Sequence, residues 1–313
     1  MNLRHLMTFV GVYEERSFSK AAKRMNATQS GLSMQTQQLE ERIGTQLFER
    51  SARGVVPTFA GQRLYEQSVE VIRKLEEIDA DIRAFRTDVG GDLSVGLMPT
   101  FTRAVLAPTL NQFIHEYPNV RVSIVEAYSA VLTEGVANRL YSFAIVPRAT
   151  RREGIRTRLL GTDREILVTR PNSGLRHLDP VRLADLPPLK LVLPGRDNAR
   201  RNAFENFAEL HGIRIASIIS MDAMIATLEF VANSDFVTIL PETICVSDID
   251  GRLRSLHPIV DPALTVDYVV IEPAVSAMPR AAALFLKGIE GQYRLLKERW
   301  ARSGEEHDLG GIR

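Results

Sequence analysis

Apolar residues recur three and four positions apart near the start of the chain. This spacing predicts a first helix over residues 3–13 and a second over residues 18–25. Ser17 precedes the second helix, and Thr28 precedes a third periodic stretch that ends at Gly44. Ser and Thr are favoured N-cap residues, and Gly is the favoured residue after a helix. Two short helices joined by a tight turn predict a helix-turn-helix, whose second helix enters the major groove of DNA.

The third periodic stretch has a polar side that suits base recognition. Its apolar positions, Leu32, Leu39 and Ile43, are expected to be buried. Gln hydrogen-bonds adenine edges, Ser reads either polarity, and Met contacts the thymine methyl group. The side chains expected to face outward are Gln29, Ser30, Ser33, Met34 and Gln37. The alternative is a small helical bundle with a solvated basic face.

The formal charge of +1, from 39 Lys and Arg against 38 Asp and Glu, is unevenly distributed along the 313 residues. Residues 1–58 carry eight bases and five acids, a balance of +3. Residues 59–92 carry five bases and eight acids, a balance of −3. Between residues 16 and 39 there are four bases and no acid. The positive charge at the front of the chain suits a polyanion.

Thr58 is expected to cap a further helix, and the stretch without proline that follows it predicts one long helix over residues 59–86. Its apolar positions are spaced as in the seam of a coiled coil. They are Leu64, Val71, Leu75, Ile78, Ile82 and Phe85. A seam this narrow needs another chain to cover it, so we expect a homodimer through this helix, or a tetramer built on it. The alternative is a helix packed on its own C-terminal segment.

Beyond residues 87–92, which contain paired glycines, short apolar runs alternate with helical ones. Strands are expected at 93–98, 120–126, 143–146, 165–169, 189–193, 213–219, 236–240 and 265–272. Helices are expected at 101–117, 130–138, 201–210, 223–232 and 281–300. This alternation favours an α/β fold with parallel sheets.

The N-terminal sequence resembles a known family. The residues that carry the resemblance are Phe18-Ser-Lys-Ala-Ala-Lys-Arg-Met-Asn-Ala-Thr-Gln-Ser-Gly-Leu-Ser, Leu39-Glu-Glu-Arg-Ile-Gly-Thr-Gln-Leu-Phe-Glu-Arg and Pro57-Thr-Phe-Ala-Gly. Over residues 2–62 they are similar to the winged helix-turn-helix of LysR-type transcriptional regulators. The resemblance implies a wing at 49–56, where Arg50 and Arg53 reach phosphates or the minor groove. Lys20 and Thr28 join the expected DNA-binding residues. Met34 stands where Arg is common, which removes one expected contact and suggests a different operator preference.

For the rest of the chain the resemblance implies two α/β lobes of periplasmic-binding type, crossed twice by the chain. It rests on Gly96-Leu-Met-Pro, Glu116-Tyr-Pro-Asn-Val and the strand order, and Ser142 stands where an aspartate is usual. Hinges are expected near 161–164 and 261–266. We therefore expect an α/β multidomain protein with a winged helix-turn-helix (1–58), a dimerisation linker helix and hinge (59–92), and an effector-binding domain (93–313). Subdomain I would comprise 93–162 and 266–300, and subdomain II would comprise 163–265.

Ligands of such folds bind at the carboxyl ends of the strands, where helix N-termini direct amides at anions. Thr and Ser hydroxyls, together with Arg148 and Arg196, would suit a small carboxylate. The expected effector site comprises Pro99, Thr100, Phe101, Thr102, Tyr128, Ser129, Pro147, Arg148, Pro194, Gly195, Arg196, Met221, Asp222 and Pro241. Other cations that would serve are Arg151, Arg152, Arg200 and Arg201. The alternatives are that Thr100 and Ser129 are N-caps and that the arginines are surface residues.

The sequence gives no sign of catalysis, a cofactor or a metal site. The six histidines lack ligand spacing, and neither a phosphate-binding glycine loop nor a nucleophile elbow occurs. Cys245, the single cysteine, lies between Ile244 and Val246 and is expected to be an inert buried thiol. The acidic pairs Glu14/Glu15, Glu40/Glu41 and Glu76/Glu77 are expected to be solvated. We therefore expect a protein that is not an enzyme.

No apolar run approaches the roughly 20 residues that span a bilayer, and no export signal follows Arg4 and His5, so a cytoplasmic protein is expected. The leading hypothesis is a transcriptional regulator whose effector shifts the placement of its DNA-binding heads. Its expected partners are a double-stranded operator, a small effector, further copies of the chain and RNA polymerase, without a membrane. The alternatives are a solute receptor of periplasmic type, a DNA-binding protein without an effector, and an enzyme with a DNA-binding module.

Overall fold

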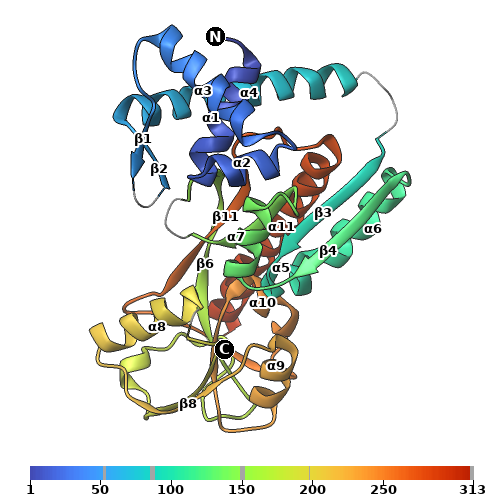
Figure 1. The fold of residues 1–313 in the computed structure, drawn as a ribbon. Coiled ribbons are helices and arrows are strands. Elements are labelled where there is room, and N and C mark those ends of the chain that lie inside the picture. Colours follow the sequence, from blue (N-terminus) through green and yellow to red (C-terminus); the bar gives the residue numbers. More distant parts are fainter. Residues whose placement is uncertain (52–53, 85–88, 149–151, 197, 311–313) are drawn as a thin grey trace. The chain divides into compact units, whose positions relative to one another are not determined.

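The structure, a computed structural model, describes residues 1–51, 54–84, 89–148, 152–196 and 198–310 (Figure 1). The chain forms two compact units. Unit 1 comprises Met1–Thr87, Arg151–Arg156 and Pro273–Pro279, and unit 2 comprises Asp88–Thr150, Thr157–Glu272 and Arg280–Arg313. Within the described ranges, no helix combines the length and apolar character needed to cross a membrane. The boundaries expected at residues 58 and 92 stay predictions.

Unit 1 begins with three short helices, followed by a two-stranded hairpin and a long helix. The elements are α1 (Leu3–Glu15), α2 (Phe18–Arg24), α3 (Gln29–Ile43), β1 (Phe48–Ser51), β2 (Gly54–Pro57) and α4 (Phe59–Ala84). The predicted caps are confirmed: the Ser17 and Thr28 side chains accept hydrogen bonds from the Lys20 and Gly31 amides. Gly44 ends α3 with φ 74°, a left-handed conformation that glycine adopts without strain.

The core of unit 1 forms where α1 crosses the other helices. Four residues of α1 are buried against Leu39, Leu47 and Ile72, namely Leu6, Phe9, Val10 and Tyr13. A second buried cluster joins Val12 to Ala21, Ala22 and Leu32. The expectation that Ile43 is buried is wrong, since its side chain is 42% exposed. Ile43 is the last residue of α3, and the chain turns away from the helix at Gly44.

In unit 2, a first lobe is built on four strands, β3 (Gly91–Leu97), β4 (Val120–Glu126), β5 (Phe143–Pro147) and β11 (Thr265–Pro273). Strand β3 pairs in parallel with β4 and β5, and β11 runs antiparallel to β5. The helical segments are α5 (Pro99–Phe101), η1 (Thr102–Leu106), α6 (Ala107–Glu116) and α7 (Ser129–Ala137).

A second lobe follows β6 (Ile155–Thr169), the longest strand in the described residues. Its further strands are β7 (Leu189–Leu193), β8 (Ile215–Ser220), β9 (Thr238–Pro241) and β10 (Ser255–Pro258). Its helical segments are η2 (Leu183–Asp185), α8 (Ala199–Leu210), α9 (Met224–Ala232), α10 (Glu242–Cys245) and η3 (Val246–Asp248). In Figure 1, α8 and α9 lie on opposite sides of this lobe.

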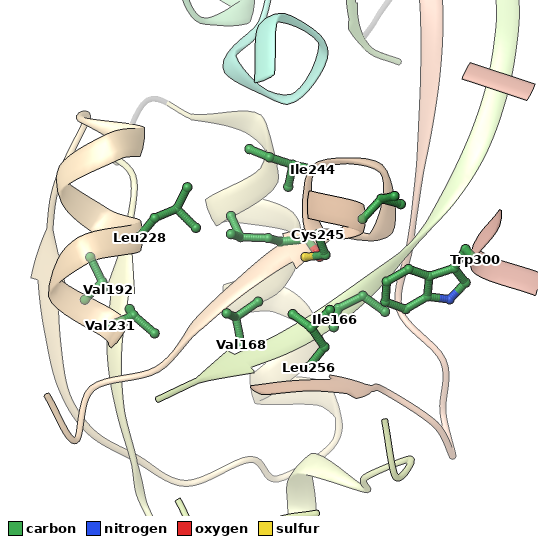
Figure 2. Close-up of a cluster of buried hydrophobic side chains, with 11 residues drawn as sticks. Ile166, Val168, Val192, Leu228, Val231, Ile244, Cys245, Leu256 and Trp300 are labelled. Atoms are coloured by element: carbon green, nitrogen blue, oxygen red, sulfur yellow. The ribbon is translucent and has the colours of Figure 1, made fainter. Parts of the chain in front are cut away.

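Helices cover both faces of the second lobe because its strands are apolar on both faces. Along β6, Ile166 and Val168 lie in the core on the α9 side, whereas Leu167 lies in the core that includes Phe204 of α8. Continuous apolar runs are typical of such doubly covered strands. The last helix, α11 (Arg280–Gly310), places Trp300 in the α9-side core, as Figure 2 shows.

The expectation of parallel sheets is only partly correct. One seven-stranded sheet has the order β10-β6-β11-β5-β3-β4, with β9 also on β6. Strands β9 and β10 both run antiparallel to β6, and β7 pairs in parallel with β8 in a separate sheet. The pattern missed β10 and the first ten residues of β6, because Arg156, Arg158, Asp163 and Arg164 interrupt the apolar pattern there.

Candidate DNA-binding and effector sites

Helix α3 presents one polar face to solvent. Leu32, Thr36 and Leu39 are buried, and these positions lie on the same side of a helix. The residues expected on the other side are accessible: Gln29, Ser30, Met34 and Gln37 are exposed, and Ser33 is half-buried. Met34 is 57% exposed. The structure therefore brings the expected base-reading residues onto one accessible surface, flanked by the exposed residues Lys20 and Thr28.

The acidic residues next to this surface are not simply solvated, so that expectation is wrong for Glu14 and Glu15. Arg24 donates hydrogen bonds to both, at 2.6 Å to Glu14 and 3.0 Å to Glu15. Glu14 also accepts a hydrogen bond from the Tyr65 hydroxyl at 3.1 Å. Burial and the Glu14 charge together raise the pKa of Tyr65. These bonds join α1 to α2 and α4, and they leave Arg24 paired.

The hairpin is attached to α3 through Glu40, which was also expected to be solvated. Its carboxylate accepts hydrogen bonds from the amides of Leu47 and Phe48, at 2.7 and 3.1 Å. Glu76 is a fourth exception, because it accepts from the Ala277 amide at 2.6 Å. The hairpin is the expected wing: Arg50 lies in β1 opposite Val55, and Arg53 lies outside the described residues.

Helix α4 has one buried side and a neighbouring exposed apolar stripe. Ile72 is buried, and Leu64, the first residue of the expected seam, packs against the core of unit 1. The next four seam positions are 43–64% exposed: Val71, Leu75, Ile78 and Ile82. Phe85 lies outside the described residues. An exposed stripe of this kind is unusual for a monomer and typical of an interface.

An interlobe cavity of about 30 Å³, room for one water molecule, lies in unit 2. Tyr128, in the loop between β4 and α7, comes from the first lobe. Leu193, Phe204, Met224 and Ile239 are among the wall residues from β7, α8, α9 and β9 of the second lobe. The cavity therefore lies where side chains of both lobes meet.

A buried ion pair forms part of the cavity wall. The Arg200 guanidinium donates two hydrogen bonds to the Glu165 carboxylate, at 2.9 and 2.7 Å, and a third to the Ile239 carbonyl. Burial opposes the charge on Arg200, but Glu165 outweighs it and raises the pKa of Arg200. The neighbouring Arg201 is bound to Glu205, Ser220 and the Pro194 carbonyl. Both guanidinium groups are therefore held by the protein.

Three of the expected effector-binding residues line the cavity, namely Tyr128, Pro194 and Met221. Two others lie beside it and contact each other, because the Gly195 amide donates to the Asp222 carboxylate at 2.9 Å. Burial raises the pKa of Tyr128, and the negative charge of Asp222 adds to this effect. The phenol is thus neutral at physiological pH and suited to hydrogen bonding.

The remaining expected residues do not line this cavity. Thr102 bonds to Glu126 and the Pro99 carbonyl, and Arg148 pairs with Asp267 at 3.4 Å. Arg196 is exposed, and Ser129 is half-buried as the first residue of α7. Four others are buried, namely Pro99, Thr100, Phe101 and Pro147, as is Pro241 at the end of β9. The alternative that Thr100 and Ser129 are N-caps is wrong, because Met98 and Tyr128 occupy those positions.

Several cavity residues were not among those expected from the sequence. They include Glu165, Phe204, Met224, Thr227 and Thr238, whereas Arg200 and Arg201 were named only as alternative cations. The sequence could have indicated Glu165, because this residue is an acid at the start of the apolar run Glu165-Ile-Leu-Val-Thr. The others lie within helices or strands rather than at strand ends, where the prediction placed the site.

Polar bonds join the lobes near the first expected hinge. Asp163 of β6 is fully buried and accepts from the Tyr293 hydroxyl of α11 at 2.6 Å. Burial and the charge of Asp163 raise the pKa of Tyr293. On η1 of the first lobe, Arg103 donates to Asp248 of the second lobe at 2.9 Å, and Asp248 also accepts from Arg254. The two hinges stay predictions, but these bonds fix the lobes in the observed arrangement.

Cys245 lies in the α9-side core of the second lobe, with its side chain turned toward Ile166 and Val168 (Figure 2). Burial raises the pKa of the thiol well above its ordinary value, so the reactive thiolate is suppressed. Among the described residues, no group of three or more His, Cys, Asp or Glu side chains is arranged to hold a metal ion.

Comparison with known proteins gives matches along both parts of the chain. The family model described as the LysR substrate binding domain matches residues 86–293. The model described as the bacterial regulatory helix-turn-helix protein, lysR family, matches residues 3–62.

Relatives match over nearly their whole length. The transcriptional regulator BbuR of Bordetella bronchiseptica is 27% identical over 98% of this chain and 94% of its own. The regulator BenM of Acinetobacter baylyi is 25% identical over 87% of this chain and 90% of its own. The crystal structure of CbnR, a LysR family transcriptional regulator, is 25% identical with a TM-score of 0.54, over 92% of this chain and all of that one. The chain therefore belongs to the LysR family: it is a DNA-binding transcriptional regulator that carries an effector-binding domain.

Proposed function

We propose that the α3 face, with residues Gln29, Ser33 and Met34, reads operator bases in the major groove while the wing contacts the backbone. The observation that supports this is the uncovered polar face of α3 beside Lys20. The Thr28 hydroxyl caps α3 at 3.2 Å, and such an N-terminus favours a nearby phosphate.

The exposed stripe on α4 supports a homodimer. Val71, Leu75, Ile78 and Ile82 are uncovered in the single chain, and a second copy of the stripe would bury them. Two copies would also supply two recognition helices for the two halves of an operator. A tetramer would combine two such dimers.

The effector binds in the interlobe cavity, and a small carboxylate remains the proposed ligand class. No side chain caps the N-terminus of α7, which begins beside Tyr128, so its first amides can bind an anion. The exposed Arg196 lies two residues from the cavity residue Pro194 and supplies a further positive charge. Arg200 and Arg201 shape the wall, since each guanidinium is already paired with a carboxylate of the protein, that of Glu165 or Glu205.

Effector binding shifts the population between two arrangements of the lobes. A cavity with room for one water molecule has to enlarge to admit a carboxylate of several carbons, so the ligand favours a more open arrangement. Opening separates Tyr128 from the second lobe and strains the bond between Arg103 and Asp248. The same coupling makes operator DNA change the effector affinity by an equal factor.

The regulator acts in the cytoplasm, where the DNA is, contacts RNA polymerase at the promoter and is not an enzyme. The buried thiol of Cys245 and the ion-paired arginines of the cavity support a binding site rather than a catalytic one.

The experiment that tests the cavity is a thermal-shift screen of aromatic and aliphatic carboxylates, followed by titration of the strongest one. Tyr128→Phe removes the hydroxyl group beside the cavity and is expected to weaken that ligand at least fivefold without changing operator affinity. Tyr117→Phe, at the end of α6, is the matched control and is expected to behave as wild type. Equal affinity for wild type and Tyr128→Phe would contradict this site.

A further inference from the structure

The second lobe contains another hollow, of about 410 Å³, at the end of β7 away from the interlobe cavity. Its walls are the segment after β6, the residues before β7 and the residues before β9. Three residues along β7, about 10 Å, separate Lys190 at this hollow from Leu193 at the interlobe cavity. A volume of this size is typical of sites for small organic molecules.

The inner wall of the hollow is apolar. Leu167 and Leu189 are buried members of the α8-side core, and Leu175 and Val237 pack against the same core. Phe236 lies in the wall as well. A ligand in this hollow would therefore bury an apolar surface of its own against leucine, valine and phenylalanine side chains.

The rim of the hollow is polar and carries an excess of positive charge. Two hydroxyl groups, those of Thr169 and Ser173, lie 2.9 Å apart. Arg170 is exposed, and among the described residues its donors reach carbonyls of its own loop alone, at 3.4 Å. Lys190 pairs with Asp235, and the charges of Lys190 and Arg170 both lower the pKa of that carboxyl. The rim thus carries two cations, Arg170 and Lys190, and one carboxylate, that of Asp235.

We propose that this hollow is a second ligand site, which takes an aromatic carboxylate. The ring lies against the apolar wall, and the carboxylate lies at the rim with Arg170, Lys190 and the half-buried Ser173 hydroxyl, whereas the Thr169 hydroxyl is buried and bonded within the lobe. The pairing of Lys190 with Asp235 leaves the Arg170 guanidinium as the main partner for the carboxylate. This proposal does not depend on the interlobe effector site.

Occupancy of this site would affect elements that also shape the interlobe cavity. Strand β7 supplies Lys190 to the hollow and Leu193 to the cavity, and the segment leading into β9 supplies Val237 and then Ile239. Leu191 and Val237 form a bridge between these two segments. A ligand in the hollow therefore contacts one end of β7 and of the segment leading into β9. The other ends of these two segments line the interlobe cavity.

The test uses the full chain and 2-naphthoate as the probe, with 2-naphthamide as its neutral counterpart. Calorimetric titration is expected to show naphthoate binding to wild type at millimolar concentration or tighter, and at least tenfold weaker amide binding. The variant Arg170→Ala/Lys190→Ala is expected to bind naphthoate at least tenfold more weakly. Arg121→Ala, which removes one cation from an exposed ion pair of the first lobe, is the control and is expected to bind as wild type.

Two further variants locate the probe. Ser173→Trp fills the hollow and is expected to abolish the naphthoate binding event that Arg170→Ala/Lys190→Ala weakens. Tyr128→Phe alters only the interlobe cavity and is expected to leave that binding event unchanged, even where naphthoate binding to the interlobe cavity is weakened. Thermal unfolding of each variant checks that it is folded, and both substituted cations are exposed. The proposal is overturned if wild type does not bind naphthoate, if the double variant or Ser173→Trp binds it as wild type does, or if only Tyr128→Phe weakens it.

Discussion

The carboxylate of Glu40 lies 2.7 Å from the backbone amide of Leu47, and this bond joins the recognition helix to the wing. Leu47 is 1% exposed, so water has little access to its amide if the carboxylate is removed. The same carboxylate accepts from Phe48, where β1 begins. One acidic residue therefore fixes two elements that we propose contact the same DNA.

Glu40→Ala is expected to destabilise unit 1 by about 1–3 kcal/mol, because it leaves two amides without an acceptor. The same substitution is expected to lower operator affinity, because the wing loses its fixed position. Urea unfolding and a gel-shift titration measure the two effects. Glu41→Ala is the matched control, because Glu41 is exposed and accepts only from Gln37 among the bonds observed. Equal effects of the two substitutions would contradict the role given to Glu40.

Met34→Arg is expected to strengthen binding to all DNA, because it places a cation at the centre of the exposed α3 face. Each added phosphate contact steepens the dependence of log affinity on log salt by about 0.9. Fluorescence anisotropy at several salt concentrations measures this slope, with operator and random DNA. Leu140→Arg adds the same charge at an exposed apolar site of unit 2 and should leave the slope unchanged. A slope unaffected by Met34→Arg would place residue 34 away from the DNA.

Ile78→Arg is expected to convert the dimer to a monomer at micromolar concentration, because it places a charge in the middle of the exposed α4 stripe. Sedimentation velocity measures the assembly state. Gln62→Arg introduces arginine at an exposed position on the opposite side of α4 and is expected to remain dimeric. If Ile78→Arg remains dimeric as well, the dimer is formed by another surface.

The stability of the second lobe is expected to depend on His257. Burial lowers the pKa of this side chain to about 4. The neighbouring His177 lowers it further, whereas a hydrogen bond to the backbone at Arg176 and the charge of Asp179 oppose the shift. Because the unfolded pKa is near 6.5, protons bind preferentially to the unfolded chain between these values, and stability falls as the pH decreases. From pH 7.5 to pH 5 the loss is about 2 kcal/mol.

Urea unfolding at the two pH values measures this loss. His257→Gln keeps a polar side chain opposite the Thr169 hydroxyl, which lies 3.2 Å from the His257 ring. In this variant the free energy of unfolding is expected to lose about 2 kcal/mol of its change between pH 7.5 and pH 5, whatever the stability of the variant at pH 7.5. An unchanged dependence in this variant would assign the effect to other groups.

Local patterns predicted much of the fold. The caps at Ser17, Thr28 and Thr58 were identified because capping involves neighbouring residues, and all three form the expected bonds. The first part of β6 was missed because Arg156 and Arg158 break the apolar pattern there. A strand that connects two lobes is exposed along part of its length, so alternation alone cannot detect it.

The candidate sites were less predictable than the fold. Helical spacing was enough to place Met34 and Gln37 on one face of α3. In the interlobe cavity, by contrast, Glu165 and Arg200 come from β6 and α8, and their pairing depends on the tertiary fold. Strand-end reasoning located Tyr128 and Met221 but could not identify wall residues such as Thr227, which lies inside α9.

Because Cys245 is buried, the reactivity of its thiol reports on local opening of the second lobe. This cysteine is the only one in the sequence, and it is 1% exposed. A thiol reagent can therefore label the protein only when the core around Cys245 opens. Labelling rates, measured with and without a ligand, would give the free energy of that local opening in the intact regulator, without any introduced probe.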